Sequence, residues 1–84
     1  MAYQKINSLE DLKNSCKDSR EDFFISMGVA RSSKSIEYSS EFDTFDIYHE
    51  IDDTWEENVK SKDLLKSNIG YALKKGILYK YWIK

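Results

Sequence analysis

The stretch FFISMGV at residues 23–29 decides the fold, because apolar side chains recur in it at every second position. Phe23, Ile25 and Met27 stand at alternate positions of this stretch. Successive side chains of a strand point to opposite faces, so this period of two predicts a strand with one strongly apolar face. The next residues, ARSS at 30–33, predict a turn that ends the strand.

Two further strands are predicted downstream of this turn. Residues 36–38 predict a short second strand, and residues 42–51 predict a third, with Phe45 and Ile47 on one face. The sequence SSE at residues 39–41 predicts the turn between them. Three consecutive strands with short connections predict an antiparallel meander with one covered and one solvated face.

Helical patterns flank the meander. Residues 8–17 repeat apolar side chains on one helix face, and Ser8 with Asp11 resembles a capping box. Residues 62–75 predict a longer helix, which Gly76 would end because glycine adopts the left-handed conformation of a helix C-terminus easily. The result is a meander bracketed by two helices.

The remaining segments complete a single small domain. Residues 54–57 resemble another capping box and predict a short helical turn, and the β-branched and aromatic residues 77–83 predict a last strand. We therefore expect one α+β domain over residues 1–84, with a small antiparallel sheet, two helices and the order α-β-β-β-α-β. If strand 77–83 is an exposed edge, it offers a route to a homodimer.

Composition narrows the protein class. The chain has one cysteine, which cannot form an internal disulfide, and its first residues lack the apolar core of a signal peptide. No apolar stretch reaches the length of about 18 residues that a membrane span needs. These features predict a soluble, cytoplasmic protein that has no membrane partner.

Charge is distributed unevenly along the chain. Residues 35–59 hold nine acidic and no basic residues, whereas residues 60–84 hold seven basic and one acidic residue. One interpretation is that the basic third neutralises the acidic segment within the fold. The other is that the acidic segment faces outward and binds a basic protein surface. In the second interpretation the candidate partner-binding residues are Glu41, Asp43, Asp46, Glu50, Asp52, Asp53, Trp55 and Glu56.

The basic end supports an alternative function. Lysines interleaved with aromatic residues are typical of proteins that bind single-stranded nucleic acid, and two hydroxyls flanked by two cations in a turn can hold a phosphate. The net charge of −2 makes direct nucleic-acid binding the less favoured hypothesis. Its candidate residues are Arg31, Ser32, Ser33, Lys34, Lys80 and Tyr81.

Few residues suit catalysis. His49 is the only histidine, and strand alternation places it opposite the carboxylates of Asp46 and Glu50. Cys16 falls on the apolar face of the first helix, which is typical of a buried thiol. No phosphate-binding loop, dinucleotide-binding turn or metal-ligand spacing is present in the sequence. We therefore predict a protein that is not an enzyme, with no catalytic residue, no bound metal and no cofactor.

Five short motifs occur in order along the chain: FFI at 23–25, RSSK at 31–34, IDD at 51–53, NIG at 68–70 and LYKY at 78–81. Together they resemble a pattern in short uncharacterised proteins of phages and mobile elements from low-GC Gram-positive bacteria. The resemblance covers about residues 22–81 and implies an accessory protein of the host cell cytoplasm that binds and modulates a host or defence protein. A nucleic-acid-processing enzyme is one such partner.

Overall fold

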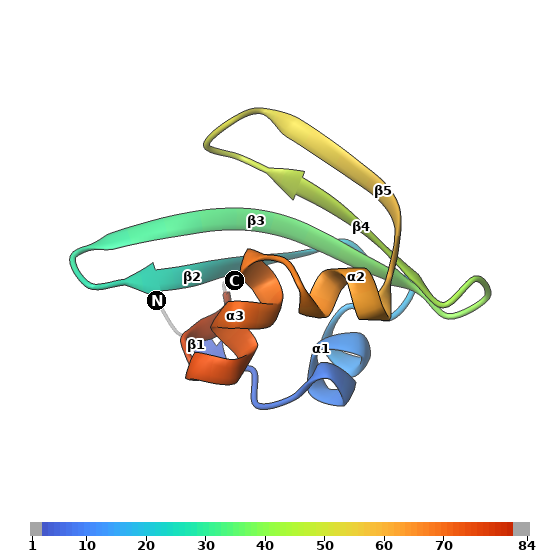
Figure 1. Ribbon diagram of the computed structural model, residues 1–84, viewed down its shortest axis with the longest axis horizontal. Helices are drawn as coiled ribbons and strands as arrows, with labels where there is room; N and C mark the ends of the chain where they lie inside the picture. The colour runs from blue at the N-terminus through green and yellow to red at the C-terminus, as the bar shows by residue number, and fades with distance from the viewer. Residues whose placement is uncertain (1–2, 82–84) are drawn as a thin grey trace.

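The computed structural model describes residues 3–81, and Figure 1 shows its elements. Within these residues three helices accompany one six-stranded sheet, so the α+β class is confirmed while the predicted element order is not. The elements are β1 (Tyr3–Lys5), α1 (Leu9–Ser15), β2 (Glu21–Met27), β3 (Ala30–Ser39), β4 (Thr44–His49), β5 (Thr54–Lys60), α2 (Ser61–Leu65), α3 (Asn68–Lys75) and β6 (Leu78–Tyr81).

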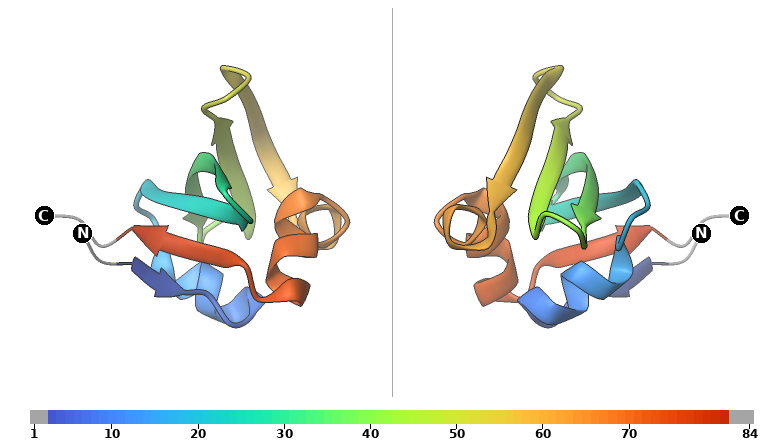
Figure 2. Two further views of the ribbon diagram at one scale, coloured as in Figure 1. Left: turned by 90° about the vertical axis from the view of Figure 1, so that its left-hand side faces the viewer. Right: turned by 90° about the vertical axis from the view of Figure 1, so that its right-hand side faces the viewer.

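The sheet has the strand order β1-β6-β2-β3-β4-β5, and every neighbouring pair is antiparallel. Figure 2 shows that it curves, with α2 and α3 between β5 and β6. All three helices contribute to one apolar core on the concave face. The core residues are Ile6, Leu12, Cys16, Phe23, Ile25, Ile36, Phe45, Ile47, Leu64, Ile69, Ala72 and Leu78.

Helix α1 begins as its sequence predicts. The Ser8 side chain accepts a hydrogen bond from the Asp11 backbone N–H, and the Asp11 carboxylate accepts one from the backbone N–H of Asn7 at 2.9 Å. The helix ends at Ser15, two residues before the predicted end. Leu12 and Cys16 are buried against the sheet, so the predicted apolar face is confirmed.

The turn between β2 and β3 lies at Gly28 and Val29 rather than at residues 30–33. Met27 pairs with Ala30, and Gly28 takes the left-handed conformation with φ of 71° that glycine adopts without strain. The predicted turn was wrong because Gly28 was assigned to the strand. As a consequence, the RSSK motif lies within β3.

Strand β5 replaces the helical turn predicted at residues 54–57. It pairs with β4, with Trp55 opposite Tyr48, and a register shift between Phe45 and Ile47 interrupts the ladder. Trp55 and Val59 are its apolar residues, and every position except Val59 is exposed, so no alternation marks it as a strand. Pairing with β4 therefore determines the conformation of this segment.

The predicted exposed edge at residues 77–83 is also wrong. Strand β6 lies between β1 and β2, and Tyr3 of β1 pairs with Tyr81. Strand β1 has three residues, too few to show a periodic pattern in the sequence. The edges of the sheet are β1 and β5, and the predicted strand residues Trp82 and Ile83 lie outside the described part of the chain.

The single helix predicted over residues 62–75 is two helices. Ser67 starts α3 by accepting a hydrogen bond from the Ile69 N–H. A Cβ on Gly70 would lie 2.1 Å from the Leu65 backbone oxygen, so the glycine permits the close approach of α2 and α3. Gly76 ends α3 with φ of 73°, as predicted.

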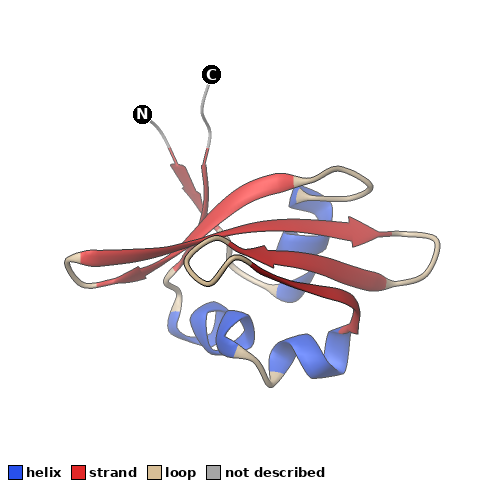
Figure 3. Cartoon of the chain, turned by 90° about the horizontal axis from the view of Figure 1, so that it is seen from above, coloured by secondary structure: helices blue, strands red, loops and turns tan. Residues whose placement is uncertain are grey.

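The described ends of the chain lie together. Figure 3 shows β1 and β6 side by side, in agreement with the pairing of residues 3–5 with residues 79–81. Along the strand order they lie at the far end of the sheet from β5. None of the helices within residues 3–81 combines the length and the apolar character that crossing a membrane requires.

Candidate functional site

Much of the acidic segment forms one hairpin. We call residues 44–60, which comprise β4, β5 and their turn, the acidic hairpin. Figure 1 shows it at the side of the sheet opposite β1. Every residue from Glu50 to Asn58 is exposed, so most of the predicted partner-binding residues are accessible.

Two of these carboxylates serve the fold locally. Asp46 accepts a hydrogen bond from the Asn58 N–H at 3.0 Å, across the irregular part of the ladder. Asp53 accepts one from the Tyr48 hydroxyl at 2.6 Å, and this bond raises the pKa of Tyr48. These two carboxylates therefore stabilise the conformation of the hairpin as well as adding to its negative charge.

Asp43 connects the turn between β3 and β4 to α1. It accepts a hydrogen bond from the Tyr38 hydroxyl at 2.5 Å and lies 3.3 Å from the Lys13 ammonium. The bond to the Tyr38 hydroxyl is the main cause of the lowered pKa of Asp43, and Lys13 adds to it. The same bond raises the pKa of Tyr38 to about 12.

The basic third of the chain does not neutralise the acidic segment within the described residues. Among the described residues an ion pair of the acidic segment joins Asp43 to Lys13, Glu56 contacts the His49 imidazole, and no carboxylate of the segment pairs with a lysine of residues 60–81. Across β3 and β4, Glu37 stands opposite Asp46, an arrangement that like charges disfavour. Within residues 35–59, the exposed carboxylates with no side-chain hydrogen bond to any described residue are Glu41, Glu50, Asp52 and Glu57.

Trp55 lies on the surface of this hairpin. Its side chain is 48% exposed, its ring packs on Tyr48 at 4.8 Å between centroids, and the Arg20 guanidinium lies 4.6 Å from the ring. Phe42 and Ile51, in the turns on either side of β4, are more exposed still. Apolar groups held between carboxylates suit a protein interface, where tryptophan is enriched.

The predicted anion-binding motif is divided between the two faces of the sheet. Because residues alternate along β3, Ser32 and Lys34 share the concave face, while Arg31 and Ser33 belong to the convex face. The Arg31 guanidinium lies 4.4 Å from the Phe24 ring centroid. The four residues therefore do not converge on one anion.

Lys80 and Tyr81, the two remaining candidate residues for nucleic-acid binding, lie on opposite faces of the sheet. The Lys80 ammonium donates to the Ser15 carbonyl at 2.9 Å and lies 3.9 Å from a Glu21 oxygen, so it joins β6 to α1 on the concave side. The Tyr81 ring packs on Phe24 at 4.7 Å, on the convex face. Arg31 and Tyr81 share one face, and Lys34 and Lys80 the other.

The convex face holds an aromatic cluster that the sequence pattern did not indicate. Phe24 is 2% exposed, although the face of β2 on which it lies was expected to be solvated. Tyr79 stacks on it at 5.2 Å, and Tyr3 meets both rings edge to face. We call Tyr3, Phe24, Tyr79 and Tyr81 the aromatic cluster. The consecutive Phe23 and Phe24 were the available signal that both faces of β2 are covered.

The structure brings Lys34 and His49 together across β3 and β4. The Lys34 ammonium contacts His49 Nδ1 at 3.0 Å and donates to the Ser32 hydroxyl at 3.3 Å, and His49 Nε2 lies 2.5 Å from Glu56 Oε2. Lys34 is 5% exposed. Burial lowers the pKa of Lys34, against the opposing charges of Asp52 and Glu56. The sequence pattern did not predict this network, because a turn at residues 30–33 would have given β3 and β4 a different register.

The other candidate for chemistry is inert. Cys16 is buried, and its thiol donates to the Leu12 carbonyl at 3.2 Å. Burial raises the pKa of Cys16 to about 12, so the thiol is protonated and unreactive near neutral pH. Within residues 3–81, no three histidine, cysteine or carboxylate side chains are grouped so as to hold a metal ion.

Comparisons with protein-family models, with curated proteins and with solved structures found no significant match. The resemblance to short phage and mobile-element proteins therefore stays a prediction. Two arrangements in the structure bear on function. One is the acidic hairpin with its exposed tryptophan, and the other is the buried Lys34 network beneath it.

Proposed function

We propose that this protein is a non-catalytic accessory protein that binds and modulates another protein through the acidic hairpin. The observation that carries the proposal is the set of exposed carboxylates of residues 35–59 that have neither an ion pair nor a side-chain hydrogen bond among the described residues, namely Glu41, Glu50, Asp52 and Glu57. Repulsion among such groups opposes folding, and a basic partner would relieve it.

The partner surface is basic and includes an apolar recess. Trp55 supplies a rigid aromatic anchor, and the neighbouring carboxylates of Asp52 and Glu57 would surround it with charge. Complementary charge mainly raises the association rate and selects the partner. A host or defence protein with a nucleic-acid-binding groove has this combination of charge and shape. In this proposal the protein originates from a phage or mobile element and acts in the host cytoplasm.

A charge-matched pair of variants tests the proposal. Glu50→Gln with Asp52→Asn removes two charges from the hairpin turn, whereas Glu10→Gln with Asp63→Asn removes two from the first turns of α1 and α2. Affinity capture from host lysate, with mass spectrometry at a series of salt concentrations, identifies and quantifies the partner. We expect the hairpin variant to recover at least about tenfold less of it, while the control recovers the wild-type amount.

Equal recovery by the two variants would remove the acidic hairpin as the interface. A second variant, Trp55→Ala, separates charge from anchoring. It should weaken capture and leave the salt dependence unchanged, because it removes apolar contact and no charge. Turnover of a substrate by the purified protein would contradict the non-catalytic part of the proposal.

The aromatic cluster favours a second candidate, the binding of single-stranded nucleic acid. Three tyrosines and Arg31 share the convex face, and such groups stack on bases and contact phosphates. A gel-shift titration with single-stranded DNA and RNA at low salt tests it. Micromolar binding that weakens steeply with salt and is lost in Arg31→Ala would favour this candidate over the first.

A further inference from the structure

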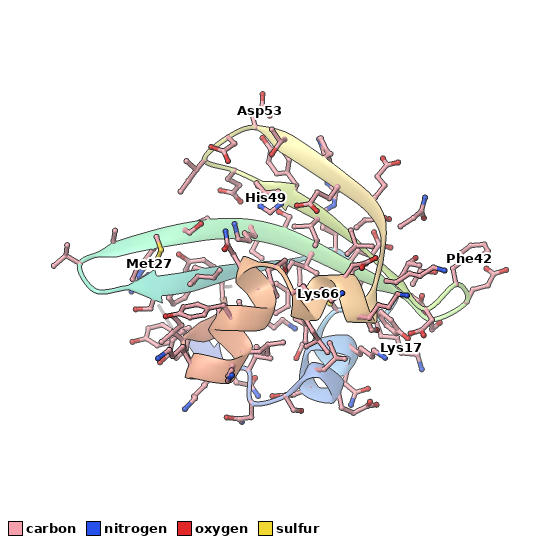
Figure 4. All side chains as sticks on the ribbon, in the orientation of Figure 1. Lys17, Met27, Phe42, His49, Asp53 and Lys66 are labelled. Atoms are coloured by element: carbon pink, nitrogen blue, oxygen red, sulfur yellow. The ribbon has the colours of Figure 1, made fainter. Side chains whose placement is uncertain are left out.

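A pocket of about 220 Å³ opens on the concave side of the sheet. Ile25 and Met27 of β2 and Ile77, which precedes β6, supply apolar walls. Ser32 and Lys34 of β3 supply polar groups. Figure 4 labels Met27 near the turn between β2 and β3 and His49 on β4.

The Lys34 ammonium is held in position at this pocket. One N–H faces His49 Nδ1 at 3.0 Å and one donates to Ser32 at 3.3 Å, so the third has no partner among the described residues. Glu56 accepts from His49 Nε2, which leaves Nδ1 as the acceptor for Lys34. The network fixes the ammonium before any ligand arrives.

Lys34 as a whole residue is 5% exposed, so a further acceptor would offset the hydration that its ammonium has lost. Asp52 and Glu56 act on it through space, but Glu56 binds the far edge of the imidazole and its side chain is 51% exposed. Water screens charges that are so exposed. An anion in the pocket would contact the ammonium directly and complete its hydrogen bonds.

The walls and the volume restrict that anion. A cavity of about 150 Å³ accommodates benzene, so this pocket has room for one ring and a small polar group. Asn68 and Tyr71 of α3, both exposed, line it where it meets solvent. One ammonium with a single free N–H suits a carboxylate, whereas a phosphate dianion needs more donors.

We propose that this pocket binds a small carboxylate with a compact apolar body, its carboxylate on Lys34 and its apolar part against Ile25, Met27 and Ile77. His49 and Glu56 of the acidic hairpin hold the Lys34 ammonium, but the proposed ligand occupies the pocket rather than the outer carboxylates, and its test uses a separate probe, so either proposal can fail without the other. It also differs from the RSSK hypothesis, because Arg31 and Ser33 belong to the opposite face.

Benzoate is the probe, with benzamide as a neutral analogue of the same shape. The Met27 methyl group lines the pocket and reports occupancy through its ¹³C and ¹H chemical shifts. At constant ionic strength we expect benzoate to shift this signal with half-saturation at about 1 mM or below. Benzamide should bind at least about tenfold more weakly, because it lacks the charge-assisted bond to Lys34.

Lys34→Met provides the second test and Ser33→Ala its control on the opposite face. The Met variant should lose at least about tenfold in benzoate affinity, and the control should bind as wild type does. No shift of the Met27 signal at about 20 mM benzoate, a concentration well above the expected half-saturation, would overturn the proposal. Equal binding of benzamide and benzoate to the wild-type protein would also overturn it, and this comparison requires no variant to fold.

Discussion

The two ends of the sheet differ in how they are covered. At the end formed by β1, β6 and β2, both faces are occupied: Phe23 and Leu78 belong to the core, and Phe24 is buried beneath the tyrosines of the other face. At the other end, β5 exposes every residue except Val59, which is half-buried. The first end is built for stability, and the second leaves its side chains available for contact.

The two turns of the acidic segment differ in how they are connected to the rest of the fold. Each turn has one aspartate bound to a tyrosine hydroxyl, Asp43 to Tyr38 and Asp53 to Tyr48. In the turn between β3 and β4, Asp43 also pairs with Lys13 of α1, and Ser40 is bound to Asp18. Among the described residues, the side-chain hydrogen bond of the turn between β4 and β5 stays within its own hairpin.

Removing one aromatic ring from each end of the sheet gives the largest expected difference in the free energy of unfolding. Phe24→Ala deletes a buried ring and should lower the free energy of unfolding by about 3–5 kcal/mol. Trp55→Ala deletes a larger but half-exposed ring and should cost about 1 kcal/mol or less. Urea unfolding followed by circular dichroism measures both losses. Equal losses would show that the acidic hairpin contributes to stability as much as the aromatic cluster does.

Gly70→Ala tests the contact between α2 and α3, the helices that lie between β5 and β6 in the chain. Because the added Cβ would meet the Leu65 backbone, α2 and α3 must move apart, and we expect a loss of about 1–3 kcal/mol. Lys74→Ala on the exposed side of α3 is the control and should change stability by no more than about 0.5 kcal/mol. A Gly70→Ala protein as stable as this control would mean that the contact can relax freely.

Acid titration tests the hydrogen bonds between Asp18 and Ser40, for which we expect the smallest change in the free energy of unfolding. The Ser40 hydroxyl and N–H donate to its carboxylate and lower the pKa of Asp18 below its usual 3.8. The bound carboxylate therefore stabilises the fold fully above pH 3.8, and this contribution is lost as the pH falls through the lowered value. Asp18→Asn keeps the backbone conformation, in which φ is 52°, and should flatten this part of the stability profile.

Asp52→Asn is the matched control for the acid titration, since no described residue donates a hydrogen bond to that carboxylate. Its stability profile should keep the slope below pH 3.8 that the wild-type protein shows. Chemical denaturation at a series of acid pH values gives the three profiles. A slope that survives in Asp18→Asn would locate the responsible carboxylate elsewhere.

Local patterns identified the elements whose conformation depends on their own residues. Ser8 starts α1, Gly76 ends α3, and the apolar alternation of β2 and β4 was recognised. Strand β5 carries no such pattern, because pairing with β4 alone makes it a strand. The break between α2 and α3 was missed because the apolar periodicity continues across it.

The sites depended on contacts between distant segments and were harder to predict. The burial of Phe24 requires β6 and β1 to pair beside β2, across more than 50 residues of sequence. The contact between Lys34 and His49 follows from a register that the turn at Gly28 sets. The exposure of the acidic hairpin was within reach, because residues 35–59, which include most of it, hold nine carboxylates and no cation and are costly to bury.

The pairing of β1 with β6 has a practical consequence for protein engineering. Since Tyr3 lies opposite Tyr81, a short linker could join the two described ends without crossing the sheet. New termini could then be opened between Gly28 and Val29, in an exposed turn that makes no contribution to the core. Such a circular permutant would retain the strand order while reversing which half of the sheet is synthesised first. Its refolding rate, compared with that of the natural chain, would reveal whether the meander or the aromatic cluster nucleates folding.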